Sequence, residues 1–216
     1  MSDFQQLRSD FQRPGISLVR GPANLTSVLL EHEGASARVS TYGAHVIDYQ
    51  PRDQAPVLWL SSHAVFQAPK AIRGGIPICW PWFAENGTDA ALPAHGFART
   101  SEWTLVDSLS SREEKSVTLL LCDDACTRAM WPHPFELRYR VTVTERLCAS
   151  LSVTNTGRQR MRFTGALHSY FDVLDIAQVS VEGLQGSTYV DKLDANCHKL
   201  QGEPRLRISS EVDRTY

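Results

Sequence analysis

Strict alternation of apolar and polar side chains over residues 135–144 restricts the fold of this chain more than any other feature. Each odd position in the run is apolar, and each even position is charged or a threonine. A period of two places the two sets on opposite faces of a strand, one of them buried. The alternation resumes over residues 147–154, after Glu145 and Arg146. The two runs predict an antiparallel hairpin.

Further short strand-like segments follow one another along the chain, separated by Gly, Pro, Asn or charged turns. They cover residues 27–32, 45–49, 103–106, 117–121, 161–170 and 179–181. Helical periodicity of useful length is missing, and no internal repeat is present. Many short strands with turns between them are typical of an all-β sandwich or barrel. A length of 216 residues suits one such domain, so we expect a single domain over residues 1–216.

The segment 69–99 interrupts this rhythm. It is rich in Pro and Gly, so regular strand pairing is not expected to run through it. A long irregular connection inside a compact domain is usually either disordered or functional. This one is too apolar for disorder, since it contains Ile72, Ile76, Ile78, Trp80, Trp82, Phe83 and Phe97. The sequence therefore predicts an ordered loop that forms one wall of a functional site.

Charge and cysteine content exclude several classes of function. The formal net charge is −2, which provides no basic field for a nucleic acid partner. The five cysteines form an odd set without paired spacings, as expected for reduced thiols. No apolar run is long enough to span a bilayer, and residues 1–14 lack the pattern of a secretory signal. We therefore expect a cytoplasmic protein without a membrane partner.

His168 is the first candidate for chemistry. Alternation over 161–170 places it on the polar face of its segment, together with Thr164 and Tyr170. If that face lines the concave side of a sheet, His168 points at a small polar ligand. A solvent-facing histidine on an exterior strand fits the pattern equally well, and the pattern does not decide between them.

Three further candidates lie in the irregular segment. His95 precedes Gly96 and lies four residues before Arg99, while Arg73 precedes two glycines. Two arginines on glycine-flanked, aromatic-rich loops suit a bidentate grip on phosphate or carboxylate. The alternatives are ordinary: a histidine that caps a turn, and arginines in surface ion pairs. Nucleotide-binding loops and a nucleophile elbow are not recognisable, so the chemistry points to acid–base work by histidine.

Three ordered blocks of the chain resemble the hexose-6-phosphate mutarotases, also called glucose-6-phosphate 1-epimerases, of the aldose 1-epimerase superfamily. The blocks are AIRGGIPICWPWF at 71–83, HGFAR at 95–99 and ALHSYF at 166–171. The likeness continues through residues 175–177 and 183–184 to 211–216, so it covers nearly the whole chain. It implies a galactose mutarotase-like antiparallel β-sandwich that interconverts the α and β anomers of aldohexose 6-phosphates. It implies no metal or organic cofactor.

Residue roles follow from the resemblance by position. His168 corresponds to the family's general acid and His95 to a second active-site histidine. Arg73 and Arg99 correspond to ligands of the substrate or its phosphate, and Asp213 to a ligand of a sugar hydroxyl. A histidine titrates near neutral pH, so it suits the transfer of a proton to and from the ring oxygen.

One part of the family pattern has no counterpart in the sequence. The family's general base is a glutamate on a strand well after the segment that matches 213–216, so we expect the last strands and that carboxylate to lie outside these 216 residues. Asp213, Asp172 or Glu85 could substitute, although nothing places them opposite His168. Two other hypotheses therefore stay open: a non-catalytic module that binds sugar phosphates, and a β-sandwich interaction domain whose arginines form ion pairs.

Overall fold

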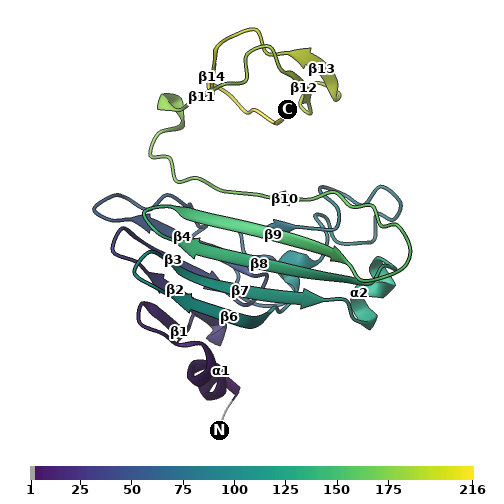
Figure 1. Cartoon of the computed structure of the whole chain (residues 1–216). Helices are drawn as coiled ribbons and strands as arrows, with labels where there is room; N and C mark the ends of the chain where they lie inside the picture. The colour runs from purple at the N-terminus through teal and green to yellow at the C-terminus, as the bar shows by residue number, and fades with distance from the viewer. Residues whose placement is uncertain (1–2) are drawn as a thin grey trace. The chain divides into compact units, whose positions relative to one another are not determined.

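The computed structural model describes residues 3–216, which form two compact units (Figure 1). The first unit ends at Asp172, and the second is Val173–Tyr216. Both units are built mainly from antiparallel strands, which confirms the predicted all-β class. None of the helices described is long and apolar enough to cross a membrane. The expectation of one domain over 1–216 stays a prediction.

The first unit is a sandwich of two four-stranded antiparallel sheets (Figure 1). One sheet contains β1 (Ile16–Arg20), β2 (Thr26–Glu31), β3 (Ala35–Ser40) and β4 (His45–Pro51) in chain order. The other contains β6 (Thr104–Ser110), β7 (Lys115–Cys122), β8 (Phe135–Val143) and β9 (Leu147–Asn155), also in chain order. Strand β2 contacts β7 and β3 contacts β8, and one hydrophobic core fills the space between the sheets.

The hairpin predicted from alternation is confirmed. Strands β8 and β9 pair from Phe135 opposite Asn155 to Val143 opposite Leu147. The five apolar side chains of β8 are at most 1% exposed, and they face the other sheet across the core. Burial of one face fixes the register, because a slip of one residue would turn that whole face to solvent.

Several elements lack a strong periodic signal and escape prediction. Among these are the strands after residue 187, the two-residue strand β5 (Ile78–Cys79), β1, β3, and the helices α1 (Asp3–Phe11) and α2 (Ala125–Met130). The expectation of no useful helix is therefore wrong at these two places. Helix α2 does carry a local signal, because Asp124 and Thr127 form a capping box in which each side chain bonds the other residue's backbone N–H.

The strand predicted over 161–170 is wrong over most of its length, since only β10 (Ala166–Leu167) is a regular strand. It pairs with β5 (Ile78–Cys79). The same register continues on both sides: the N–H groups of Thr164 and His168 donate to the carbonyls of Pro81 and Pro77, at 3.0 and 3.1 Å. Proline has no N–H to return the bond, so the regular ladder stops at both positions. The alternation of side chains persists even so.

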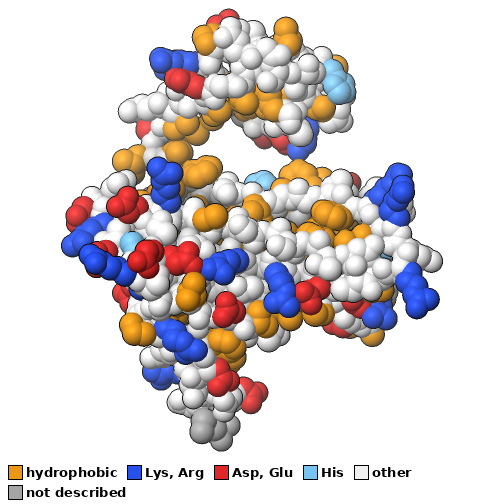
Figure 2. Space-filling model, viewed as in Figure 1, with side chains coloured by type: hydrophobic (Ala, Val, Ile, Leu, Met, Phe, Trp, Pro, Cys, Tyr) orange, Lys and Arg blue, Asp and Glu red, His pale blue; other side chains and the backbone are white. Residues whose placement is uncertain are grey.

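That alternation leaves much of the apolar face exposed, whereas the polar face is exposed at Arg162 and Thr164 and half-buried from residue 166 onward. Phe163 and Leu167 are 45% and 37% exposed. With Trp80, Leu151 and Val153 they line an apolar groove of about 410 Å³ between β9 and β10. Figure 2 shows hydrophobic side chains gathered along these two strands. His168 and Tyr170, on the other face, are half-buried.

The second unit contains two small antiparallel sheets. Strand β11 (Ser180–Glu182) pairs with β14 (Arg205–Arg207), and β12 (Thr188–Asp191) lies between β13 (Cys197–Leu200) and β15 (Arg214–Thr215). The one large apolar side chain buried in this unit is Tyr189 among the residues described. Its ring packs against Tyr216 at 5.0 Å and beneath the guanidinium of Arg214 at 4.4 Å.

Candidate active site

The irregular segment 69–99 is ordered by its apolar side chains, as the sequence predicts. Trp80 at its centre is 1% exposed and packs edge-on against the rings of Phe97, Trp131 and Phe135. Most of the other apolar residues in the segment are also buried: Ile72, Ile76, Ile78, Trp82 and Phe97. Its only regular elements are β5 and the short 3₁₀ helix Ala98–Thr100. Core packing, not strand pairing, therefore holds this wall in place.

The structure brings His95 and His168 together. Their ring centroids are 6.4 Å apart, and the ring of Phe83 lies 4.9 Å from His95 and 6.0 Å from His168. His168 reaches this position because its N–H donates to the carbonyl of Pro77, within the segment that also carries Arg73. The solvent-facing alternative is not what the structure shows, because the His168 ring is half-buried and Nδ1 is fully buried.

The His95 ring is also held by the backbone. Its Nδ1 accepts a hydrogen bond of 3.0 Å from the N–H of Ala84, and its own N–H donates to the carbonyl of Ala84 at 2.7 Å. The prediction that His95 caps a turn is therefore correct for its Nδ1 atom, which accepts the backbone N–H of Ala84. Since Nδ1 accepts, the neutral ring carries its proton on Nε2, where it is a donor.

Gly96 permits the tight backbone beside His95. The carbonyl of Trp80 accepts the N–H groups of both Phe97 and Ala98, which draws residue 96 onto the Trp80 backbone. A Cβ on Gly96 would lie 2.0 Å from the Trp80 oxygen, and the φ of Gly96 is +71°. Only glycine combines this φ with so close an approach.

The two arginines differ in burial. Arg99 is half-buried, donates from Nη2 to the carbonyl of Ala94 at 2.8 Å, and has a buried Nε with no hydrogen-bond partner among the described residues. Arg73 is exposed, and its carbonyl accepts the N–H of Ser61 at 3.0 Å. Within residues 3–216 neither arginine forms an ion pair with an acidic side chain. The ion-pair alternative is therefore not supported for either one.

His45, a residue the sequence did not single out, supports the loop that carries Arg73. It is fully buried, and its Nε2 lies 2.7 Å from the carbonyl of Gly74. A Cβ on the next residue, Gly75, would lie 2.8 Å from this nitrogen and 2.3 Å from the carbonyl of Val46. Burial lowers the pKa of His45 to about 4, and the positive charge of Arg99 acts in the same direction. The neutral ring therefore donates to Gly74.

Two of the three carboxylates named from the sequence, those of Asp172 and Glu85, lie in the first unit and form no hydrogen bond with His168 there. Asp172 and Glu85 are both exposed. Asp213 belongs to the second unit, where its carboxylate lies 3.1 Å from Nζ of Lys192. Within the first unit, over residues 3–172, no carboxylate is hydrogen-bonded to His168.

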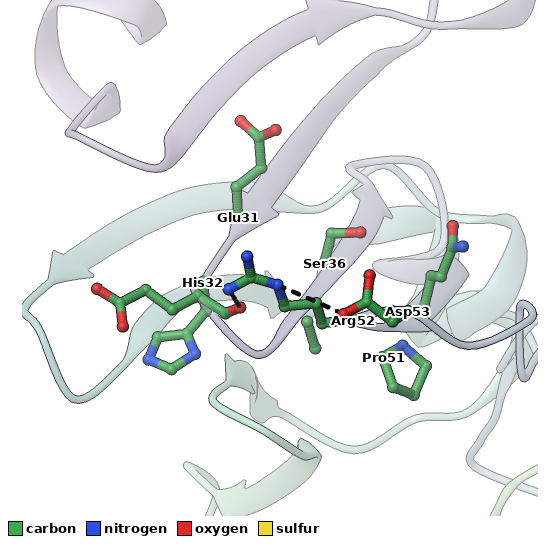
Figure 3. Close-up of a pocket in the computed structure, with 9 residues that line it drawn as sticks. Glu31, His32, Ser36, Pro51, Arg52 and Asp53 are labelled. Atoms are coloured by element: carbon green, nitrogen blue, oxygen red, sulfur yellow. Dashed lines mark hydrogen bonds and ion pairs between the residues drawn. The ribbon is translucent and has the colours of Figure 1, made fainter.

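A polar pocket of about 410 Å³ lies at the far end of β4 from His45 (Figure 3). Strand β4 has seven residues, which separates the two places by about 20 Å. The guanidinium of Arg52 donates to the carbonyl of Glu33 at 3.2 Å and lies 3.8 Å from the carboxylate of Asp53. Both charged side chains are largely exposed, so this ion pair contributes little. None of the predicted site residues lines this pocket.

Comparison with known proteins identifies the family. The aldose 1-epimerase family model matches residues 26–216. The chain belongs to the aldose 1-epimerase family. It is 35% identical over 194 residues to a protein of Escherichia coli named "Putative glucose-6-phosphate 1-epimerase", covering 89% of this chain and 63% of that protein. A protein of the same name from Salmonella typhimurium is 36% identical over 193 residues, covering 89% and 64%. This aldose 1-epimerase family chain thus spans less than two thirds of these curated relatives.

Solved structures share the fold of this chain. A crystal structure described as a putative mutarotase from Salmonella typhimurium has a TM-score of 0.86 and 33% identity, covering 94% of this chain and 67% of that one. A galactose mutarotase-like protein from Clostridium acetobutylicum has a TM-score of 0.69 at 15% identity, covering 85% and 62%. The predicted galactose mutarotase-like sandwich is therefore confirmed for this aldose 1-epimerase family member.

The first testable prediction concerns Gly96. We expect Gly96→Ala to lower the free energy of unfolding by more than about 1 kcal/mol, because alanine must adopt an unfavourable φ and displace the Trp80 carbonyl. Urea unfolding measures the change. Gly87→Ala is the matched control, since Gly87 has open space around its Cβ position and no positive φ. Equal effects of the two substitutions would contradict this account of the His95 loop.

The second prediction concerns His45 and pH. The pKa of His45 is about 4 in the folded chain and 6.5 in the unfolded one, so the unfolded chain binds more protons between these values. The His45 contribution to stability is therefore complete above pH 6.5 and falls as pH decreases to 4, by about 3 kcal/mol. Urea unfolding at several pH values should show a shallower pH dependence for His45→Gln. The exposed His63→Gln control should keep the original dependence.

Proposed function

We propose that this chain catalyses interconversion of the α and β anomers of glucose 6-phosphate and related aldohexose 6-phosphates. The observation that carries the proposal is the pair of imidazole rings, His95 and His168, at 6.4 Å in a wall that also bears Arg73 and Arg99. Membership of the aldose 1-epimerase family and the names of the curated relatives support it.

The proposed reaction opens and recloses the sugar ring. A base takes the proton of the anomeric hydroxyl while an acid protonates the ring oxygen, and the bond between C1 and the ring oxygen breaks. The open aldehyde rotates about C1–C2 and recloses on its other face, which returns both protons. We assign the acid to His168, since an imidazole both gives and retakes a proton near neutral pH.

His95 takes a different part in this proposal. Its Nδ1 is engaged with Ala84, so its Nε2–H is suited to donate a hydrogen bond to a sugar oxygen and to orient the ring beside His168. We assign the base to none of the described residues.

Arg73 and Arg99 are proposed to bind the 6-phosphate. A phosphate presents oxygens that match the planar N–H groups of a guanidinium, and both arginines lack an acidic partner among the described residues. Binding of the 6-phosphate by the two arginines holds the sugar in a fixed position beside the two imidazole rings. The sugar-hydroxyl role of Asp213 and the cytoplasmic location stay predictions from the sequence.

The third prediction tests His168. We expect His168→Ala to lower the rate of anomer exchange of glucose 6-phosphate by roughly 10²–10⁴-fold, the usual contribution of a positioned acid–base group. NMR exchange spectroscopy on the equilibrium mixture of anomers measures the rate above the uncatalysed background. The exposed His63→Ala is the control and should retain the original rate. An unchanged rate in His168→Ala would show that the assignment is wrong.

The same experiment separates the enzyme from the binding-module hypothesis. Calorimetric binding of glucose 6-phosphate by the unsubstituted chain, without any acceleration of exchange, would favour a sugar-phosphate module and contradict the proposed reaction. Absence of both binding and exchange at millimolar substrate would leave the interaction-domain hypothesis.

The fourth prediction tests the proposed binding of the 6-phosphate by Arg73 and Arg99. Loss of one charge-assisted hydrogen bond costs about 1.5–3 kcal/mol, so Arg73→Gln and Arg99→Gln should each raise KM for glucose 6-phosphate by roughly ten- to a hundredfold. Exchange of unphosphorylated glucose should be slow in all forms and unaffected by either substitution. Arg52→Gln, an exposed arginine at the far end of β4, is the control. Equal loss of activity on glucose and glucose 6-phosphate would overturn the phosphate role.

A further inference from the structure

The ring of His168 lacks the hydrogen bond that normally orients a catalytic imidazole. Such a ring is usually fixed by a bond from its second nitrogen to a carboxylate or a backbone carbonyl. Here Nδ1 of His168 is buried and has no hydrogen-bond partner among residues 3–216. The backbone of His168 is held at Pro77, but that bond leaves the side-chain torsions free. Another contact must therefore set the orientation of the ring.

Aromatic packing is the contact that the structure provides. The ring of Phe83 is stacked on His168 with centroids 6.0 Å apart and an interplanar angle of 23°. The ring of Tyr170 lies 4.9 Å from His168 and is tilted by 49°. Phe83 also contacts His95 at 4.9 Å, so it is the aromatic ring in contact with both imidazoles.

The position of Phe83 is tied to the segment that carries His168. The N–H of Phe83 donates to Oγ1 of Thr164 at 3.0 Å, and the N–H of Thr164 donates to the carbonyl of Pro81 at 3.0 Å. Thr164 lies on the same face of its segment as His168, four residues earlier. The two segments thus lock the Phe83 backbone and the His168 backbone in one register.

We propose that Phe83 is a positioning residue that fixes the His168 imidazole, and its spacing from His95, by ring packing in place of a hydrogen bond. Aromatic pairing of this kind shifts the balance between two ring orientations by roughly two- to tenfold. The consequence for catalysis is larger, because displacement of a reacting group by about 1 Å costs roughly 10²-fold in rate. The effect on rate rests on the proposed function, but the effect on ring orientation does not.

The fifth prediction uses Phe83→Leu, with Phe83→Tyr as the conservative variant. Phe83→Leu removes the aromatic ring and keeps an apolar side chain, while Phe83→Tyr keeps the aromatic ring. Phe163→Leu is the matched control, because this ring lies on the opposite face of the His168 segment and packs against Trp80. The His168 ring signals are the nuclear Overhauser effects between the ring protons of His168 and Tyr170, which report the ring orientation and do not depend on the ring current that Phe83→Leu removes. Anomer exchange gives kcat and KM, and thermal unfolding reports on folding.

We expect Phe83→Leu to move the His168 ring signals and to lower kcat by roughly tenfold or more, with KM changed less than twofold. Phe83→Tyr should keep both the His168 ring signals and kcat at their values in the unsubstituted chain. Unmoved His168 signals in Phe83→Leu, or moved signals with an unchanged kcat, would overturn the proposal, as would an equal loss in Phe163→Leu. If Phe83→Leu does not fold, Phe83→Met applies the same criteria.

Failure of the proposed function is distinguishable from failure of this inference. A chain without any anomer exchange contradicts the proposed reaction, whereas the His168 signals still decide whether Phe83 orients the ring. Unmoved signals in an active Phe83→Leu variant refute the positioning role and leave the reaction standing.

Discussion

The antiparallel contact between residues 164–170 and residues 75–81 is the interaction on which the candidate site depends. Three N–H groups of the later segment, those of Thr164, His168 and Tyr170, donate to carbonyls of the earlier one at 2.9–3.1 Å. This contact joins segments almost 90 residues apart in the chain and sets His168 beside the loops of Arg73 and His95. Prolines 77 and 81 accept without donating, so the contact orders the backbone without extending the sheet.

The wall that receives His168 owes its shape to burial and close backbone approach. Trp80 packs in the core against three aromatic rings. Its carbonyl accepts hydrogen bonds from the N–H groups of Phe97 and Ala98. That convergence forces residue 96 to be glycine and places His95 at a φ of +65°. A buried neutral His45 supports the neighbouring loop at Gly74. Rigid support of this kind is what a positioned acid–base site requires.

The two histidines are held by different means. His95 is tied through Nδ1 to the backbone at Ala84, which fixes its tautomer as well as its position. His168 has packed aromatic rings as neighbours, and its Nδ1 is unbonded in the described structure. A hydrogen bond orients a ring because one ring nitrogen must point at its partner, whereas ring packing orients it because neighbouring side chains leave little room for other rotamers. The difference suits the two roles proposed above, in which His95 orients a sugar oxygen and His168 exchanges a proton.

The sequence by itself determined the sandwich class, the β8–β9 hairpin and the ordered apolar wall, because each has a signal local to the chain: a period of two, a short polar turn, and Pro and Gly among aromatic residues. Motif resemblance named His95, His168, Arg73 and Arg99. Alternation through 161–170 correctly set Thr164 and His168 on one face. It could not show that the apolar face would be exposed, or that two prolines in a distant segment would interrupt the strand.

Only the tertiary structure decided which side chains meet. The ring contact between His95 and His168, the support of the Arg73 loop by His45, and the stacking of Phe83 all join residues distant in the chain. No local period encodes such contacts, since they arise when core burial and backbone hydrogen bonds fix several segments at once. His45 shows the limit most clearly: its sequence neighbours are those of an ordinary strand, and its role follows from a carbonyl 29 residues away.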